Sequence, residues 1–478
     1  MTGASLAEIV AQSGGQLLTQ SSSTIGEVRL SGVSHDSRTV RRGDLFACIS
    51  GDQHDGHLYA TEALKAGASA LLVERELDDA VPQIVVPNVR KSLGPIAASI
   101  YGEPSQQLKV VGVTGTAGKT TTVHALAAIL KSCGEKSRSI GTLDGPRTTP
   151  EAPELQRSLA ELLDTGTDWV CMEVSSHGLE LGRVDGTHFA AAIFTNLSFE
   201  HLDFHGGMDK YFRAKRRLFD ERTDTAVVSV GDEWGRRLAR ELSASREVVE
   251  VDPHLIQDPR MTKDGATFVW RGEEIETSLI GYFNLVNLLM AAETLTALGF
   301  DRADIARGVP LVRPVRGRME PVSVPGSNLC VLVDYSHKPD ALSEALKAAR
   351  SITKGRVWVV FGAGGDRDQT KRSVMGEVAA GLADEVIVTS DNPRSENPAD
   401  IADQILKGTR QGTARSRIVL DRATAIHSAI SKATAGDLIL VAGKGHETHQ
   451  IIGRQRQPFE DVVVCKQALT HRFEGGFR

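Results

Sequence analysis

Short apolar segments of strand length alternate along this chain with amphipathic segments of helix length. The clearest short segments consist of nearly continuous runs of β-branched and other apolar residues, some flanked by polar ones. They span residues 109–115, 168–174, 190–196, 225–230, 356–362, 384–390 and 437–443. Such strands are buried on both faces, as in parallel sheets, and their alternation with helices is typical of α/β domains. The pattern therefore predicts an α/β fold with mostly parallel sheets.

Two polar junctions that contain proline divide the chain into three parts. They read YGEPSQQLK at 101–109 and RPVRGRMEP at 313–321, and segments of this kind commonly link domains. A chain of 478 residues also exceeds what one hydrophobic core usually organises. We expect three domains: a small N-terminal α/β domain over 1–107, a central domain over 108–318 and a C-terminal, Rossmann-like domain over 319–478.

A glycine-rich segment, GVTGTAGKTTT at 112–122, follows a predicted strand and opens a predicted helix that ends at Gly134. The backbone N–H groups of such a loop and the positive partial charge of the helix start favour phosphate oxygens. Lys119 would reach the outer phosphates, and the Thr120 hydroxyl would bind magnesium. The loop departs from the usual P-loop pattern because Val113 stands where the first glycine is expected. We predict a nucleotide site formed by Gly115, Thr116, Ala117, Gly118, Lys119, Thr120 and Thr121.

The loop alone does not identify the reaction, because kinases, GTPase switches, transporter motors and ligases all use a phosphate-binding loop of this kind. Further candidate groups follow the next two predicted strands. Glu173 ends one of them, and the segment TNLSFEHLDFHG after the other carries Glu200, His201, Asp203 and His205. Ligands bind at this edge of open α/β sheets, and Mg²⁺ prefers oxygen ligands. Glu173 and one of these residues are therefore candidate magnesium ligands, and position alone does not choose between the two histidines.

The charge and cysteine content narrow the classes of partner. The chain has 55 Lys and Arg against 61 Asp and Glu, a net charge of −6, which provides no broad basic field for nucleic acid or an anionic membrane. The five cysteines stand singly, with no CxxC pair, as in a reducing compartment. No run of 18 apolar residues occurs. We expect a cytoplasmic monomer that binds small molecules, and no nucleic acid or membrane.

Several motifs occur in the order in which the Mur ligases carry them. They are TGTAGKTT, EVSSHG, NLSFEHLDFHG, YFRAKRRLF, GYFNLVNLLMAAE, RGRME and DYSHKPDAL, and together they span nearly the whole chain. The Mur ligases are ATP-dependent, ADP-forming amide ligases that build the peptidoglycan peptide, and thus serve cell wall biogenesis, cell shape and cell division. Within that family the chain resembles the ligases that add meso-2,6-diaminopimelate to the D-Glu carboxyl of UDP-MurNAc-L-Ala-D-Glu.

The resemblance implies ATP and Mg²⁺ as cofactors and an acyl phosphate as the intermediate. It implies catalytic roles for Lys119, Glu173, His201 and Lys215, the last carbamylated, and metal contacts from Thr120, Glu173, His201 and the carbamylated Lys215. It implies further ATP contacts from Asn287, Arg318, Asp334 and His337. Ala117 stands where asparagine is commoner and Glu200 where aspartate is commoner, but neither change removes a proposed ligand.

The resemblance also places the uridine-nucleotide substrate. Ser37 in the HDSR motif of the N-terminal, UDP-binding domain matches a nucleotide contact. Thr148, Thr149, Ser175 and Arg183 match positions that contact the muramoyl-dipeptide. Leu181 is often glutamine in relatives, so one substrate hydrogen bond is lost here or replaced by water.

Three segments of the C-terminal domain follow predicted strands and carry complementary charges. They supply Arg367, then Asp391, Asn392, Pro393 and Arg394 as DNPR, and then Gly443 and Glu447 within GKGHE. Loops at the carboxyl ends of parallel strands can converge on one crevice. Two guanidinium groups and one carboxylate suit the zwitterionic distal end of diaminopimelate. Lysine lacks the distal carboxylate, and would leave a desolvated arginine unpaired at a cost of about 1–3 kcal/mol.

Three alternative functions remain. A lysine-adding homologue is the nearest alternative, and a folylpolyglutamate synthase-like ligase shares the central and C-terminal domains but not this N-terminal unit. A P-loop kinase belongs to a different class, and would turn over ATP without dependence on an amine.

Overall fold

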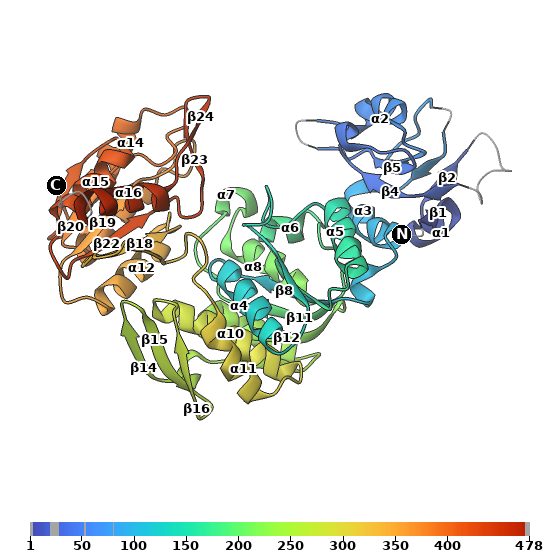
Figure 1. Ribbon diagram of the computed structural model, residues 1–478. Coiled ribbons are helices and arrows are strands. Elements are labelled where there is room, and N and C mark those ends of the chain that lie inside the picture. Colours follow the sequence, from blue (N-terminus) through green and yellow to red (C-terminus); the bar gives the residue numbers. More distant parts are fainter. Residues whose placement is uncertain (1–2, 20–27, 52–53, 80, 474–478) are drawn as a thin grey trace. The chain divides into compact units, whose positions relative to one another are not determined.

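The computed structural model describes residues 3–19, 28–51, 54–79 and 81–473 (Figure 1). The chain forms two compact units, neither of which is one continuous segment. Unit 1 comprises 1–252 and 290–305, and unit 2 comprises 253–289 and 306–478. The long helix α10 (Tyr282–Ala297) therefore contributes its first half to unit 2 and its second half to unit 1.

The first sheet of unit 1 has five strands in the order β2-β7-β6-β5-β4. Their bounds are β2 (Gln16–Leu18), β4 (Gly32–Ser34), β5 (Asp44–Ala47), β6 (Ala70–Val73) and β7 (Gln83–Val85). Only β2 is antiparallel to its neighbour. One face packs against α1 (Leu6–Ser13) and α3 (Val89–Ile100), and the other against α2 (Ala60–Ala66). A two-stranded sheet, β1 (Ala4–Ser5) with β3 (Arg29–Leu30), lies beside them.

The second sheet of unit 1 has six parallel strands in the order β13-β12-β11-β8-β10-β9. They are β8 (Lys109–Thr114), β9 (Ser137–Ile140), β10 (Trp169–Glu173), β11 (Phe189–Phe194), β12 (Thr223–Ser229) and β13 (Val248–Val251). The helices of this region are α4 (Lys119–Ser132), α5 (Ala152–Asp164), α6 (Ser176–Glu180), α7 (Leu202–His205), α8 (Met208–Arg216) and α9 (Glu233–Ser243). Side chains of α5, α8 and α9 pack against one core with alternate residues of the strands.

Unit 2 begins with an antiparallel sheet of three strands and continues with a six-stranded sheet. The first consists of β14 (Ile256–Thr262), β15 (Gly265–Trp270) and β16 (Glu273–Thr277). The second has the order β17-β18-β22-β19-β20-β21, with only β17 antiparallel. Its strands are β17 (Glu320–Val322), β18 (Cys330–Asp334), β19 (Val357–Phe361), β20 (Glu385–Val388), β21 (Arg415–Ile418) and β22 (Leu438–Ala442).

Helices cover both faces of the six-stranded sheet of unit 2. One face packs against α12 (Pro339–Ser351), α13 (Lys371–Leu382) and α14 (Pro398–Thr409), and the other against α15 (Arg422–Lys432) and α16 (Asp461–Phe473). The hairpin β23 (His449–Ile452) with β24 (Gln455–Pro458) follows β22. A short helix, α11 (Arg302–Gly308), precedes β17.

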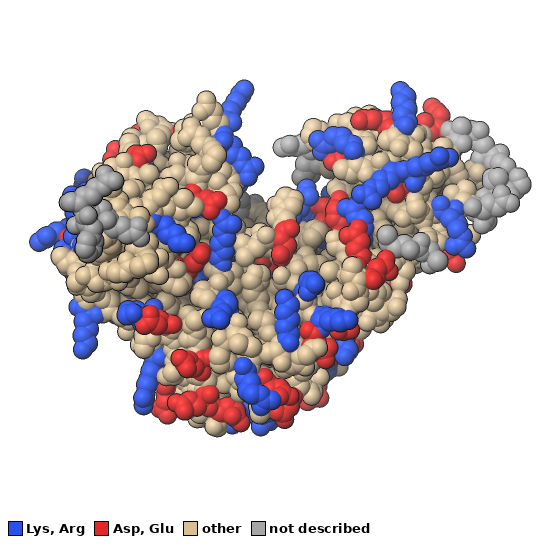
Figure 2. All heavy atoms as spheres, in the orientation of Figure 1, with Lys and Arg blue, Asp and Glu red and all other residues tan. Residues whose placement is uncertain are grey.

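The prediction of an α/β fold with mostly parallel sheets is confirmed. All seven predicted strands are present within a few residues of their expected bounds, and α4 begins at Lys119 as expected. Gly134 follows the end of α4 with φ of +89°, the left-handed conformation that commonly ends a helix. Among the described residues no helix is long and apolar enough to cross a membrane. On the face shown in Figure 2, acidic and basic side chains are interspersed.

A fully buried ion pair, Arg422 with Asp461, ties together the first residues of α15 and α16. The guanidinium donates to both carboxylate oxygens at 2.7 Å, and both side chains are completely inaccessible to solvent. Arg422 Nη2 also donates to the carbonyl of Ala442 at 2.9 Å, where β22 ends. A charge buried this deeply depends on its partner, so the pair fixes the end of β22 against two helices.

We predict that Asp461→Asn lowers the free energy of unfolding of the protein by about 3–5 kcal/mol, because it leaves a buried guanidinium without its counter-ion. Urea denaturation followed by circular dichroism measures the change. Glu344→Gln is the matched control, since Glu344 pairs with Lys347 on the surface. Loss of such an exposed ion pair should change the free energy of unfolding very little. Equal destabilisation by the two substitutions would contradict the role given to the buried pair.

Candidate active site

The end of β11 shapes the phosphate loop that follows β8. A Cβ on Gly115, whose φ is +150°, would come within 1.9 Å of the Thr195 hydroxyl, so this position requires glycine. The amide N of Ala117 donates to Asn196 Oδ1 at 3.0 Å, and the Thr195 hydroxyl donates to the carbonyl of Ala117 at 2.7 Å. Because β8 and β11 are neighbours in the sheet, their end loops form one structure.

Two lysines converge on a single carbonyl oxygen of this loop. Lys119 Nζ and Lys215 Nζ donate to the carbonyl oxygen of Gly115 at 2.7 and 2.8 Å. Lys215 comes from α8, is 1% exposed and lies over the ring of Tyr211 at 4.7 Å. Two ammonium groups on one acceptor repel each other, more strongly when buried than in water. The arrangement concentrates positive potential at the loop, and this potential favours a phosphate or another anion.

Thr120 and Glu173 meet at the carboxyl edge of the same sheet. The Thr120 hydroxyl donates to Glu173 Oε2 at 3.0 Å, and the amide of Thr142 donates to Oε1 at 2.8 Å. Adjacent oxygens around an octahedral Mg²⁺ lie about 2.9 Å apart, so this pair fits two of its positions. Within the described part of the chain no cluster of three or more His, Cys, Asp or Glu is placed to hold a metal. An ion here would take its other ligands from water and substrate oxygens, as Mg²⁺ commonly does.

The two histidines that the sequence left open have different surroundings. His205 is buried, its Nε2 lies 3.0 Å from the Ser176 hydroxyl, and burial is the main cause that lowers its pKa to about 4. His201 has a 42% exposed side chain, lies 3.1 Å from Glu200 and packs edge-on against His177. The ring of His201 also lies edge-on to that of Tyr211, so its contacts in this structure are with Glu200, His177 and Tyr211.

Three of the residues predicted to contact the dipeptide lie together beside Glu173. The hydroxyl of Thr149 lies 3.1 Å from that of Ser175 and 3.0 Å from the backbone oxygen of Glu173. Arg183 Nη1 donates to the carbonyl of Thr149 at 3.1 Å. Thr148 lies next to them, with its hydroxyl 3.0 Å from that of Thr142.

Glu151 is a neighbour of this cluster that the sequence did not single out. Its buried carboxylate lies 2.8 Å from Arg183, 3.4 Å from Arg90 and 3.9 Å from Arg147. Three guanidinium groups around one carboxylate leave a net positive charge, which suits an anionic ligand. No local motif could reveal the group, because Arg90 belongs to α3 and the contact forms only in the folded unit.

The HDSR turn that contains Ser37 lies close to the same region. His35 Nδ1 is 3.7 Å from the Glu154 carboxylate in α5. Asp36 accepts the amide of Arg38 at 3.0 Å and thereby orders the turn around Ser37. Unit 1 therefore places the Ser37 turn near the helix that follows Thr149.

In unit 2 the three predicted loops converge at the carboxyl edge of the sheet, because β22, β19 and β20 are adjacent. A Cβ on Gly364 would come within 2.9 Å of Arg394 Nη1 and 3.8 Å of Arg367 Cγ, so both arginines flank this glycine. Asn392 Nδ2 donates to Glu447 Oε2 at 2.8 Å. The Cβ position of Gly443 is 2.6 Å from Asp391 Oδ2.

Two buried cations that the sequence analysis missed support these loops. Lys444 is fully buried and lies 2.8 Å from Glu447 Oε2. Burial alone would raise the pKa of Glu447, but the Lys444 ammonium and the hydrogen bonds to the carboxylate lower it overall. Arg372 in α13 is also fully buried and donates to both oxygens of Glu396 at 2.8 Å. The alternation of apolar residues along the sequence gives no signal for either pair.

The predicted ATP contacts of unit 2 mostly surround Tyr335. Arg318 lies over its ring at 4.5 Å, and His337 Nδ1 is 2.9 Å from its carbonyl oxygen. The Asp334 carboxylate accepts the amides of Met319 and Ser336, both at 2.8 Å. Asp334 thus orders the segment after Arg318.

Asn287 lies elsewhere, in the first half of α10. It is buried and donates to Asn284 Oδ1 at 3.3 Å.

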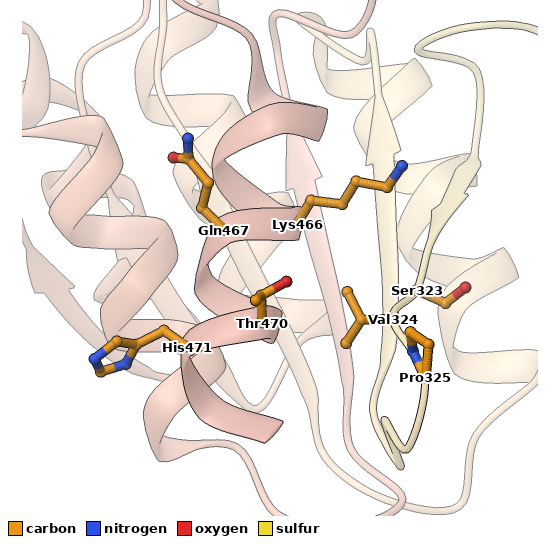
Figure 3. A pocket seen from close by; sticks show the side chains of 7 residues that line it. All are labelled: Ser323, Val324, Pro325, Lys466, Gln467, Thr470 and His471. Carbon is orange, nitrogen blue, oxygen red and sulfur yellow. The ribbon is translucent and has the colours of Figure 1, made fainter. Parts of the chain in front are cut away.

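A hollow of about 670 Å³ on unit 2 has no predicted site residue in its lining. It is lined by Ser323, Val324, Pro325, Lys466, Gln467, Thr470 and His471. Lys466 and His471 extend in different directions from α16 (Figure 3). Its polar groups do not converge on a ligand position, so we do not assign the active site to it.

Comparison with known proteins identifies the family. Three domain models match in order: "Mur ligase family, catalytic domain" at 29–101, "Mur ligase middle domain" at 113–295 and "Mur ligase, glutamate ligase domain" at 317–445. UDP-N-acetylmuramoyl-L-alanyl-D-glutamate–2,6-diaminopimelate ligase of Geobacillus thermodenitrificans is 41% identical, over 91% of this chain and 94% of its own. The enzyme of that name from Streptomyces coelicolor is also 41% identical, over 93% of each chain.

Solved structures agree with these relatives. A structure of a UDP-N-acetylmuramoyl-L-alanyl-D-glutamate–2,6-diaminopimelate ligase, 32% identical, has a TM-score of 0.70 and covers 98% of this chain and 99% of its own. MurF from Acinetobacter baumannii, 19% identical, has the same TM-score and coverage, and shows a shared fold. The relatives at 41% identity are matched over nearly their whole length, and the protein belongs to the Mur ligase family.

Proposed function

We propose that this protein is an ATP-dependent, ADP-forming ligase that joins meso-2,6-diaminopimelate to the D-Glu carboxyl of UDP-MurNAc-L-Ala-D-Glu. The names of relatives at 41% identity support this reaction. The observation that carries it is the arrangement in unit 2, where Arg394 and Arg367 flank one glycine and Glu447 lies on an adjacent loop. These charges match the distal carboxylate and ammonium of the amino acid.

The reaction needs activation of the carboxylate, because its oxygen is a poor leaving group. The D-Glu carboxylate oxygen attacks the γ-phosphorus of ATP, ADP departs, and an acyl phosphate remains. The amine of the second substrate then attacks the acyl carbon, the tetrahedral intermediate expels inorganic phosphate, and the ammonium proton is lost to solvent. Lys119 and the amides of the phosphate loop would stabilise the negative charge on the transferred phosphoryl group.

Thr120 and Glu173 would hold magnesium, since their oxygens already lie at the separation of adjacent octahedral ligands. A bound magnesium ion would neutralise charge on the phosphate oxygens. His201 would join this site only if its exposed side chain changed position, because its present contacts lie with Glu200 and His177.

Carbamylation of Lys215 would remove an electrostatic conflict at the phosphate loop. Lys119, which is half-buried, and Lys215, which is buried, share one carbonyl acceptor, so two positive charges are held close together. Attack of the neutral Lys215 amine on CO₂, with loss of a proton, gives an anionic carbamate. An anion beside Lys119 replaces repulsion with attraction and provides oxygen atoms for a second magnesium ion.

We retain the predicted domains, with UDP bound over 1–107, ATP over 108–318 and the amino acid over 319–478. The second and third matching domain models begin at residues 113 and 317, near the proposed boundaries at 108 and 319, and the first matches 29–101 within the proposed N-terminal domain. We also propose that the protein is a monomer and that it works in the cytoplasm, where its nucleotide substrates occur.

The proposed activity predicts phosphate release only when all substrates are present. With ATP, Mg²⁺ and UDP-MurNAc-L-Ala-D-Glu, addition of meso-diaminopimelate should start steady release of phosphate, while lysine or no amino acid should give little. A chromatographic assay of the tripeptide product provides the second readout. Faster release with lysine would favour the lysine-adding alternative, and amine-independent turnover would favour a kinase.

Arg394→Lys should raise the KM for diaminopimelate about tenfold or more, because a point charge cannot reproduce a bidentate guanidinium contact. The KM for ATP should not change, since Arg394 belongs to the amino acid pocket. Steady-state kinetics with each substrate varied in turn measures both constants. Arg410→Lys, an exposed substitution at the end of α14, is the control. An unchanged KM for diaminopimelate in Arg394→Lys would remove this residue from the pocket.

If Lys215 is carbamylated, wild-type protein incubated with ¹³C-bicarbonate should show a carbamate carbonyl signal in its ¹³C NMR spectrum. The Lys215→Met variant should lack this signal. Ligase activity should fall in CO₂-depleted buffer and return when bicarbonate is added. Lys210→Met, an exposed substitution in the same helix, should keep both properties. Full activity of Lys215→Met would show that neither the lysine nor its carbamate is needed.

A further inference from the structure

Lys444 is one of the few fully buried lysines of the described chain, and all of its hydrogen-bonding capacity is used. Its ammonium lies 2.8 Å from Glu447 Oε2, 3.2 Å from Asn392 Oδ1 and 2.7 Å from the carbonyl oxygen of His449. A lysine ammonium has three N–H donors, and here each has an acceptor. The lysine therefore connects the loop after β20 with the loop after β22.

The ammonium also determines the orientation of the Asn392 amide. Asn392 Oδ1 accepts from Lys444 and from the amide of Ile451, the latter at 2.9 Å. The amide nitrogen must then lie on the other side, where Nδ2 donates to Glu447 Oε2 at 2.8 Å. A neutral side chain at position 444 would remove one of the two donors that fix this orientation.

Both hydrogen bonds to Glu447 reach the same carboxylate oxygen. Oε2 accepts from Lys444 and Asn392, and no described residue donates to Oε1. The side chain of Glu447 is 25% exposed, whereas that of Lys444 is completely buried. The carboxylate is thus held by one oxygen from the protein side, with the second oxygen left for a ligand.

A carboxylate in such surroundings needs a counter-ion. Asp391, on the same loop as Asn392, is also buried; burial raises its pKa, and the nearby Arg422 and Lys444 lower it. Lys444 is the cation in hydrogen-bond contact with Glu447, and its charge and hydrogen bond lower the pKa of that carboxyl against the effect of burial. A protonated Glu447 would no longer attract an ammonium group.

We propose that Lys444 is a positioning residue for the amino acid substrate, which fixes the orientation of Asn392 and Glu447 and keeps Glu447 anionic for the substrate's distal ammonium. This inference rests on the proposed diaminopimelate ligase activity. Lys444 does not touch the substrate, because all three of its donors are turned toward the protein.

The test is the kinetic effect of Lys444→Met, which keeps the length of the side chain and removes its charge. The KM for diaminopimelate should rise about 10-fold to 100-fold, as expected for loss of a charged hydrogen bond that orders the site. The KM values for ATP and UDP-MurNAc-L-Ala-D-Glu should not change, and kcat should change much less than the KM for diaminopimelate. Lys347→Met is the matched control, because Lys347 pairs with Glu344 at 2.8 Å on the surface of the same unit.

A double mutant separates action through Glu447 from a general effect. If Lys444 acts through this carboxylate, Lys444→Met combined with Glu447→Gln should have the same KM for diaminopimelate as Glu447→Gln alone. Additive effects, or an equal rise in the KM of all three substrates, would overturn the inference. Should Lys444→Met not fold, Lys444→Gln retains hydrogen-bonding groups without the charge and is expected to show the same selective rise.

Failure of both variants to fold would assign Lys444 a purely structural role and overturn the inference. Failure of the proposed function is a separate outcome, because the wild-type protein would then release no phosphate in response to diaminopimelate.

Discussion

Buried cations hold the loops of both candidate sites in place. An ammonium or guanidinium group removed from water must have acceptors around it, since its desolvation is otherwise too costly. Lys215 takes its acceptor from the phosphate loop, Lys444 from the loops after β20 and β22, and Arg422 from Asp461 and the end of β22. Each of these side chains connects segments that are far apart in the sequence, so the loop conformations depend on one another.

The parallel sheets supply the scaffold on which this constraint acts. Neighbouring parallel strands end at one edge, so the phosphate loop, Glu173 and the Thr195–Asn196 segment meet in unit 1, and three charged loops meet in unit 2. The two sites have different electrostatic requirements. Under the proposed function, the phosphate loop would bind a polyanion with its positive charge, whereas the loops that carry Arg367, Arg394 and Glu447 would bind a zwitterion with charges of both signs.

The sequence predicted those features of the structure that depend on local sequence patterns. Buried β-branched runs gave the strands, the glycine-rich turn gave the phosphate loop, and the positions of Thr120 and Glu173 after strands placed them at one edge, where they lie 3.0 Å apart. It did not predict the antiparallel sheet β14–β16, because β14 is mostly polar and exposed. It also missed Lys444, Arg372, Glu151 and two of the three arginines around Glu151, namely Arg90 and Arg147. Their roles depend on partners that only the tertiary fold brings close, and the present contacts of His201 depend on its loop in the same way.

The central claim is that matched charges in the unit 2 pocket select the amino acid that is added. The most direct test is a crystal structure of the protein with meso-diaminopimelate. We predict that the distal carboxylate lies within hydrogen-bond distance of the Arg394 guanidinium and that the distal ammonium contacts Glu447 Oε1. Electron density for the amino acid away from the 391–394 loop, or with its distal end turned to solvent, would contradict the account.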